Sequence, residues 1–319
     1  RGAAVMGAIS ALDEALYDIA GKFYGVPVYR LLGGKCRDKV RVYNHTAGRT
    51  EEELIENAIK GKEEGFTALG HLNPYLDEPR NQPFHDNNTQ MLYNAERRIA
   101  RVREAVGEDT DLCLELHRRL EPGLAVQLSA RLEPYAPMFL EDPIRPDNFD
   151  EMARVAQQCQ IPIATGERIN SLFEFEMLLE RGACSYVRAS IGVCGGFTGI
   201  KKIAALAEAH HKSLVPHNPL SPVTTNALLQ FCAATDNIAI CEYPDPYAAS
   251  TADHLTGSGS KLRQVDMVTQ IPKFEKGYVE IPEGPGLGID LISDVEERFP
   301  FRPHAVGTRL NLDGSICDQ

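Results

Sequence analysis

Residues 111–143, DLCLELHRRLEPGLAVQLSARLEPYAPMFLEDP, decide the fold because they contain one complete strand–helix–strand unit. The apolar run DLCLEL is followed by the amphipathic stretch GLAVQLSARLEPY and then by a second apolar run, MFLE. Two short strands joined by a helix of this length predict a parallel pair with a helical crossover. Each predicted strand ends in an acidic residue, Glu115 or Glu141.

The same alternation continues on both sides of this unit. The other predicted strands are KVRVYNH (39–45), FTALGHL (66–72), IPIATGE (161–167), SYVRASI (185–191), SLVPHN (213–218) and AICEY (239–243). The helical stretches include residues 3–24, 51–65, 93–107, 148–159, 172–182 and 197–211, and residues 74–90 and 245–275 are irregular. Eight strands alternating with helices predict a parallel sheet closed into a (β/α) barrel. Strands of a β-sandwich would return about every 8–12 residues, which excludes that fold.

Composition and charge argue against several classes of binding partner. The formal net charge is −12, with 43% hydrophobic residues. An acidic chain lacks the basic face that nucleic acid or an anionic membrane requires, so neither is an expected partner. No apolar run approaches the roughly 20 residues that cross a bilayer. The eight cysteines show no metal-binding spacing and lie mostly in apolar runs, which predicts a cytoplasmic protein with reduced thiols.

Three glutamates end successive predicted strands. Glu115, Glu141 and Glu167 follow one another at equal intervals of 26 residues. The carboxyl ends of barrel strands meet at one mouth, where three desolvated carboxylates would repel one another unless a cation neutralised them. Hard oxygen ligands favour Mg²⁺ with open positions for substrate. The alternative is that each glutamate pairs with a nearby arginine, such as Arg118 or Arg168.

Two histidines and a fourth glutamate also follow predicted strands. His117 lies two residues after Glu115, and His217 ends SLVPH on the opposite side of the predicted barrel. Histidines on both sides of a substrate suit an acid and a base, although a lone histidine is more often structural. Glu242 ends the last strand and either contacts substrate or serves as a buried pairing carboxylate. The other seven histidines have no comparable support, and most of them are predicted on surfaces or loops: His45, His71, His85, His210, His211, His254 and His304.

Longer motifs across the chain resemble a known family. They are MGAISALDEALYDIAGK, VYRLLGGK, LELHRRLEP, FLEDP, IATGERI, CGGFTGIKKIAALAEAH, PHNPLSPV and PEGPGLGI. Together they are similar to the mandelate racemase branch of the enolase superfamily, within it to acid-sugar dehydratases acting on galactonate, mannonate or gluconate. The resemblance implies an α/β fold, an enolase-type (β/α) barrel (a modified TIM barrel) with a partial α+β capping domain. Residues 1–38 would be a helical remnant of the cap, 39–280 the barrel, and 281–319 a segment returning to the cap.

The resemblance also implies roles for the strand-end residues. Glu115, Glu141 and Glu167 match the family's metal ligands for Mg²⁺. His117 matches the general acid that protonates the departing 3-hydroxyl, and His217 matches the base that removes the C2 proton. The implied reaction is dehydration of an aldonate, through an enediolate, to a 2-keto-3-deoxy sugar acid.

Some positions depart from the family pattern. Many relatives carry a Lys-x-Lys pair where this chain has Gly70-His71-Leu72, so no lysine base is available there. Ser190 replaces the aspartate that usually orients the histidine of the seventh strand. We therefore expect His217 to be less basic, because its imidazolium would lack an anionic partner.

Three further residues complete the predicted site. Arg188, Asn73 and Tyr75 are predicted to bind the substrate, a small-molecule sugar acid. The resemblance further implies a homo-oligomer. Two alternatives remain at this point: a racemase, epimerase or cycloisomerase of the same superfamily, and a metal-binding relative with little catalysis.

Overall fold

A parallel barrel forms the centre of the molecule. The computed structural model describes residues 2–77, 87–219, 221–244, 246, 264–300 and 309–317. Within these ranges the barrel strands are β1 (Lys39–His45), β2 (Ala68–Leu72), β3 (Asp111–Glu115), β4 (Phe139–Glu141), β5 (Ile163–Thr165), β6 (Tyr186–Val187), β7 (Ser213–Leu214) and β8 (Cys241–Glu242). Each pairs in parallel with its neighbour from β1 to β7, and β8 pairs in parallel with β1. A parallel bridge between Leu214 and Ile238 closes the ring.

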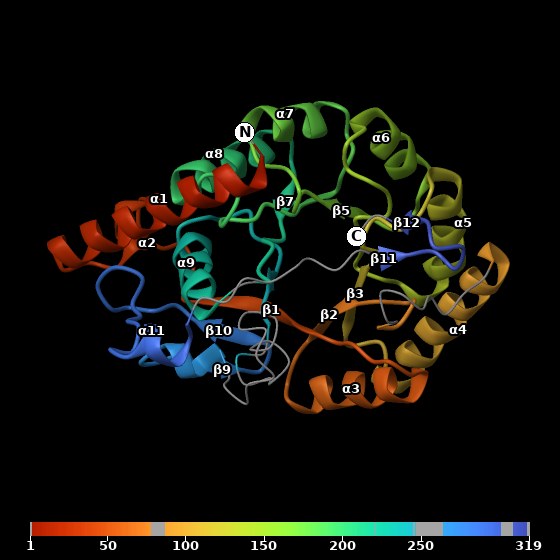
Figure 1. The fold of residues 1–319 in the computed structure, drawn as a ribbon, viewed down its shortest axis with the longest axis horizontal. Helices are drawn as coiled ribbons and strands as arrows, with labels where there is room; N and C mark the ends of the chain where they lie inside the picture. The colour runs from red at the N-terminus through yellow and green to blue at the C-terminus, as the bar shows by residue number, and fades with distance from the viewer. Residues whose placement is uncertain are drawn as a thin grey trace.

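Helices surround these strands on the outside. They are α3 (Glu51–Glu63), α4 (Asn88–Val106), α5 (Pro122–Leu132) with the short 3₁₀ helix η1 (Glu133–Tyr135), α6 (Phe149–Gln158), α7 (Leu172–Glu180), α8 (Gly196–Ala209) and α9 (Pro222–Ala233). Figure 1 shows them arranged in a ring around the sheet. The predicted (β/α) barrel is therefore confirmed, with strand positions that match the sequence prediction within a few residues.

Local sequence explains where several barrel helices begin. The side chain of Thr50 accepts a hydrogen bond from the backbone N–H of Glu53, and Asn87 does the same for Gln90. Asn148, Ser171 and Ser221 cap α6, α7 and α9 in the same way. Each cap satisfies a backbone donor that the first turn leaves unpaired.

The alternation predicted a helix between the last two strands, where α9 lies, but gave it no residue range, and burial explains why. Nearly every residue of Pro222–Ala233 is buried, whereas α6 exposes one face and buries Met152, Ala153 and Val155. A helix that is buried on all sides, with polar Thr225, Asn226 and Gln230 among its buried residues, has no single apolar stripe with a 3.6-residue period. Residues 74–90 and 245–275 were predicted as irregular, but α4 already begins at Asn88 and η2 (Gln264–Met267) and β9 (Phe274–Glu275) lie in the second stretch.

Side chains fill the inside of the barrel below its mouth. The inner layer consists of Tyr43, Ala68, Cys113, Phe139, Ala164, Val215 and Ile240, all of them buried. The rings of Tyr43 and Phe139 meet edge to face with centroids 6.4 Å apart. The interior is thus a packed core and not a channel, so substrate access is expected at one end.

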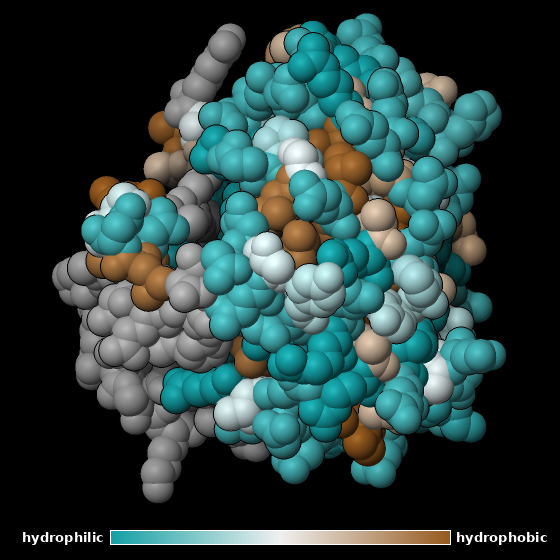
Figure 2. Space-filling model, turned by 90° about the vertical axis from the view of Figure 1, so that its right-hand side faces the viewer, coloured by the Kyte–Doolittle hydropathy of each residue, from teal (hydrophilic) through white to brown (hydrophobic). Residues whose placement is uncertain are grey.

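The outer face around α4 and α5 is mostly hydrophilic, as Figure 2 shows.

The N-terminal helix α1 (Ala3–Tyr24) packs on the barrel helix α8. The ring centroids of Tyr17 and Phe197 lie 5.0 Å apart. The Ser10 hydroxyl accepts a hydrogen bond from the backbone N–H of Gly195. The opposite face of α1 exposes large apolar side chains, among them Leu16 at 65% and Phe23 at 81%. One side of this helix therefore lies outside the packed core.

The C-terminal part returns to α1 and to the short helix α2 (Val28–Leu31). The backbone N–H of Val28 donates to the carbonyl of Gly286, and Asp18 accepts from the backbone N–H of Leu287. Strand β10 (Tyr278–Glu280) pairs antiparallel with β1 and β9, and helix α11 (Val295–Arg298) and the hairpin β11–β12 (Arg309–Leu310, Ile316–Cys317) follow. The predicted domain boundaries remain a prediction. Among the described residues, none of the helices has the length and apolar character needed to span a bilayer.

Candidate active site

Polar side chains gather at the carboxyl ends of the barrel strands. They are His45, His71, Glu115, His117, Glu141, Asp142, Glu167, Arg188, His217, Asn218 and Glu242. The parallel direction of the strands brings these ends to one edge of the barrel. All the catalytic and metal-binding residues predicted from the sequence lie in this group.

Two of the three predicted metal ligands are deeply buried carboxylates. Glu115 and Glu141 are direct register partners on β3 and β4, and they are 2% and 1% exposed. Burial and the charges of Glu141 and Glu167 raise the pKa of Glu115 well above its ordinary value. Burial raises the pKa of Glu141 to about 7, although Arg188 opposes the shift. Crowded, desolvated oxygen donors of this kind fit a hard divalent cation such as Mg²⁺, which would remove their repulsion.

Arginine and histidine side chains bind two of these carboxylates, Glu141 and Glu167. Arg188 Nε donates to Glu141 Oε1 over 2.5 Å, and His217 Nε2 lies 2.8 Å from Glu167 Oε2. Glu167 also pairs with Arg118 over 2.5 Å and with Arg168 over 3.3 Å. The pairing that the sequence left open as an alternative therefore occurs at Glu167. Glu115 makes no ion pair with any described residue.

The three glutamates are consequently not drawn together around one point. Among the described residues, the groups with ligand atoms within 4.8 Å of one another are His45, His71 and Glu242, and His71, Glu115 and His117. A cation on the three glutamates would have to share Glu141 with Arg188, which binds Oε1, and Glu167 with His217, which lies beside Oε2. Their role as Mg²⁺ ligands stays a prediction that their chemistry supports.

His117 has a backbone conformation that is unusual for a non-glycine residue. Strand β3 ends at Glu115, and His117 follows it with a φ of 50°, in the left-handed region. Its backbone N–H donates to Glu115 Oε1 over 2.7 Å. Burial and the neighbouring His71 lower the pKa of His117 well below its ordinary value. A left-handed non-glycine residue stores strain of about 1–3 kcal/mol, and such residues concentrate at functional sites.

His217 differs from the sequence prediction in its basicity. Burial lowers the pKa of His217, but the charges of Glu167 and Glu242 outweigh burial, so the pKa is raised overall. The expectation of a weaker base was therefore wrong in direction, because Glu167 supplies the anionic partner that Ser190 cannot. The partner binds Nε2; the buried Nδ1 of His217 has no hydrogen-bond partner in the described parts of the chain.

Arg188 and Glu242 form a buried network across the barrel. The Arg188 side chain, 1% exposed, donates to Glu141, to Glu242 Oε2 over 2.8 Å, and to the carbonyls of Val215 and Pro216. Glu242 also accepts from the backbone N–H of Asn218 over 2.7 Å. The structure thus shows the pairing alternative for Glu242. The catalytic role of Glu242 and the substrate-binding role of Arg188 stay predictions.

His45 and His71 belong to the mouth, so their prediction as surface or loop residues was wrong. His45 ends β1 and places Nε2 2.7 Å from Glu242 Oε1. His71 lies on β2 between two other rings, with centroids 4.6 Å from His45 and 4.8 Å from His117. Burial and His45 lower the pKa of His71 to about 3. The place of His45 at the end of KVRVYNH was the signal that could have identified it.

Of the remaining histidines, His210 and His211 follow α8 at the surface, as predicted. His85, His254 and His304 lie outside the described residues.

Tyr43 explains the absence of a lysine or arginine at position 70. A Cβ atom added at Gly70 would lie 1.9 Å from Cδ2 of the Tyr43 ring. The Tyr43 side chain therefore fills the space that any longer residue at Gly70 would need. Packing against Tyr43 therefore accounts for the glycine at position 70.

Asn73 and Tyr75 shape the loop that follows β2. The Asn73 side chain accepts from the backbone N–H of Tyr75 and donates to the carbonyl of Leu76. Asn73 and Tyr75 are 5% and 1% exposed, and the guanidinium of Arg119 lies 5.4 Å from the Tyr75 ring centroid. These contacts support the loop, and substrate binding by either residue stays a prediction.

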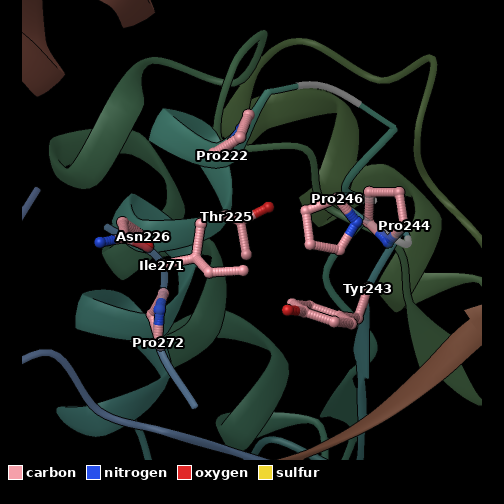
Figure 3. A pocket seen from close by; sticks show the side chains of 8 residues that line it. All are labelled: Pro222, Thr225, Asn226, Tyr243, Pro244, Pro246, Ile271 and Pro272. Carbon is pink, nitrogen blue, oxygen red and sulfur yellow. The ribbon is translucent and has the colours of Figure 1, made fainter. Parts of the chain in front are cut away.

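A small apolar pocket lies behind the mouth. Its lining is Pro222, Thr225, Asn226, Tyr243, Pro244, Pro246, Ile271 and Pro272, which Figure 3 shows as sticks. The volume is about 10 Å³, roughly the space of one water molecule. It contains none of the predicted site residues and is therefore separate from the predicted site.

Comparison with known families shows to which family the chain belongs. Residues 80–295 match the family model described as enolase C-terminal domain-like, and residues 1–33 match the mandelate racemase/muconate lactonizing enzyme N-terminal domain. The chain belongs to the enolase superfamily. The resemblance noted in the sequence motifs is thereby confirmed.

Similar proteins of the enolase superfamily include several dehydratases. D-galactonate dehydratase from Ralstonia pickettii is 35% identical over 91% of this chain and 72% of its own length. D-mannonate dehydratase from Caulobacter vibrioides is 32% identical over 99% of this chain and 80% of its length. A crystal structure of a candidate galactarate dehydratase from Agrobacterium radiobacter, with sodium and L-malate bound, superposes with a TM-score of 0.87 at 30% identity, covering 100% of this chain and 80% of that chain. These relatives support the assignment of the chain to the hydro-lyases.

Proposed function

We propose that the protein dehydrates a sugar acid of the aldonate class to a 2-keto-3-deoxy sugar acid with the help of Mg²⁺. The observation that carries this proposal is the pair of histidines, His117 and His217, at a mouth that also holds buried glutamates. The dehydratase names of the relatives support the reaction class. Cytoplasmic location and assembly into a homo-oligomer remain predictions from the sequence and the resemblance.

Glu115, Glu141 and Glu167 would hold the metal ion. All are oxygen donors at or just beyond neighbouring strand ends, and burial keeps bulk water from screening Glu115 and Glu141. When bound, Mg²⁺ supplies the positive charge that makes a proton beside a carboxylate removable. The remaining chemistry belongs to the side chains of the protein.

His217 is proposed as the base for the proton on C2. Its pKa is raised by Glu167 and Glu242 in spite of burial, which favours proton acceptance. His117 is proposed as the acid for the departing 3-hydroxyl, which leaves as water with the proton from His117. Burial and His71 lower the pKa of His117, so this role requires the negative charge of a bound sugar acid to favour the protonated imidazole. The electron pair of the C2–H bond first moves toward the substrate carboxylate, which gives the enediolate, and then forms the C2–C3 double bond as the C3–O bond breaks. The resulting enol takes a proton at C3, loses the proton of its hydroxyl and becomes the 2-keto product.

Arg188 is proposed as a positioning residue that links Glu141 to Glu242. Its guanidinium donates to both carboxylates from a fully buried place. A planar, permanently charged group holds two carboxylates at fixed separation better than a flexible lysine does. Asn73 and Tyr75 would then form the substrate-facing wall beside β2.

A panel of aldonic acids tests this function. The full chain is incubated with each acid and Mg²⁺, and 2-keto-3-deoxy products are detected as semicarbazones. We expect turnover of at least one acid, loss of turnover on chelation, and restoration by added Mg²⁺. The same incubations in heavy water report proton exchange at C2. Exchange or inversion at C2 without water loss would instead indicate a racemase or epimerase, and metal binding without exchange a non-catalytic relative.

A further inference from the structure

The histidine side of the mouth has a donor set of its own. Strand β1 lies between β2 and β8, so it places His45 beside His71 on one side and Glu242 on the other. The potential ligand atoms of these three residues all lie within 4.8 Å of one another. Three separate strands therefore bring two imidazoles and one carboxylate to one point.

Contacts with other residues orient the carboxylate of this group. Oxygen Oε2 of Glu242 accepts from Arg188 and from the backbone N–H of Asn218, which leaves Oε1 directed at His45. Outer hydrogen bonds of this kind fix a ligating carboxylate and are a regular part of metal sites. The Arg188 bond also leaves Glu242 ionised, as a metal ligand must be.

The two imidazoles are held in fixed positions as well. The rings of His45 and His71 stack with centroids 4.6 Å apart and an angle of 22° between their planes. His71 has a φ of 49°, a left-handed conformation that non-glycine residues rarely adopt without a compensating function. Its neighbour Gly70 lies against the Tyr43 ring, which leaves no room for a Cβ atom there.

We propose that His45, His71 and Glu242 form a second metal site, which binds a divalent transition metal such as Zn²⁺. Two imidazoles and one carboxylate are the ligand set of many catalytic zinc sites, where a fourth position takes water or a ligand oxygen. Imidazole ligands favour Zn²⁺, Co²⁺ or Ni²⁺, whereas the all-oxygen set of the glutamates favours Mg²⁺. The mouth would therefore bind two kinds of cation at two places, Mg²⁺ at the glutamates and a transition metal at the histidines. This proposal goes beyond the dehydration and does not depend on it.

Binding requires only a local rearrangement. His45 Nε2 and Glu242 Oε1 are 2.7 Å apart, and the metal takes the place of the hydrogen atom between them. Two ligands of a tetrahedral zinc ion are about 3.3 Å apart for bonds of about 2.0 Å, so these two atoms separate only slightly. The imidazole of His45 then carries its hydrogen on Nδ1.

A cobalt titration tests the second site. The full chain is titrated with Co²⁺ in a large excess of Mg²⁺, and the visible absorption of Co²⁺ with nitrogen ligands is followed. We expect one bound Co²⁺, displaced by Zn²⁺ but not by more Mg²⁺. His45→Asn and His71→Asn should each weaken Co²⁺ binding by about a hundredfold or more. His211→Asn is the matched control, because His211 is exposed beyond α8, and should leave binding unchanged.

Other outcomes overturn the proposal. Competition by Mg²⁺ would put the Co²⁺ on the glutamates instead. Loss of the absorption in His117→Asn but not in His45→Asn would place the metal on the other face of His71, with Glu115. Circular dichroism of each variant separates a lost ligand from a lost fold.

Discussion

The two sides of the barrel mouth are built in different ways. On the side of β3 to β5, Glu115 and Glu141 extend directly from neighbouring strands and carry raised pKa values because burial and like charges crowd them. On the side of β1 and β2, His45 and His71 stack on each other, and His71 needs a left-handed backbone. The carboxylate side carries like charges that repel one another, whereas the histidine side offers nitrogen donors beside one paired carboxylate. Left-handed residues occur on both sides, at His71 and at His117. The two sides therefore suit different kinds of cation.

Removing one charge from the carboxylate side should have the largest effect. We expect Glu115→Gln to lower dehydration by about a thousandfold or more, because the variant loses a metal ligand and the electrostatic stabilisation that depends on it. Turnover is measured with the best acid of the panel over a range of Mg²⁺ concentrations. Glu121→Gln, at an exposed residue outside the mouth, is the control and should retain full activity. Normal turnover by Glu115→Gln would show that the carboxylate side does not hold the metal.

The sequence predicted the carboxylate side far better than the histidine side. Glu115, Glu141 and Glu167 follow regular apolar strands at equal spacing, so strand ends and periodicity were enough to group them. His71 lies inside a strand in a conformation that no spacing rule predicts.

Long-range contacts also could not be predicted from the sequence. The bonds of Arg188 to Glu141 and Glu242 join residues 47 and 54 positions apart, and only the closed barrel brings them together. The basicity of His217 was misjudged for the same reason, since its partner Glu167 comes from another strand. The barrel itself needed only local patterns, except at α9, where complete burial hides the helical period.

The two histidines that flank the site should separate the two steps of the reaction. We expect His117→Asn to lower dehydration by about a hundredfold or more, while exchange of the C2 proton in heavy water continues. His217→Asn should lose both exchange and dehydration, because it removes the base. The two variants are compared by product formation and by NMR of the C2 position. Loss of exchange in His117→Asn with retention in His217→Asn would reverse the assigned roles.

The arginine that joins the two sides should matter for stability. Arg188→Met removes a buried cation between Glu141 and Glu242, and we expect it to lower the free energy of unfolding by about 3–5 kcal/mol. The control is Arg154→Met, which breaks an ion pair with Glu151 whose arginine is 67% exposed; the expected loss is about 0–1 kcal/mol. Urea denaturation at neutral pH measures both. Equal losses in the two variants would mean that Arg188 does not hold the sides together.

The smallest expected effect tests the packing under the histidine side. Gly70→Ala places a Cβ 1.9 Å from the Tyr43 ring, and we expect a loss of about 1–3 kcal/mol in the free energy of unfolding. Gly123→Ala in α5 meets no atom within 4 Å and should be neutral or slightly stabilising. If the clash is the cause, combining Gly70→Ala with Tyr43→Ala should cost less than the sum of the single losses, which a double-mutant cycle measures. Simple additivity would mean that Tyr43 is not what keeps a longer side chain, such as a lysine base, out of this strand.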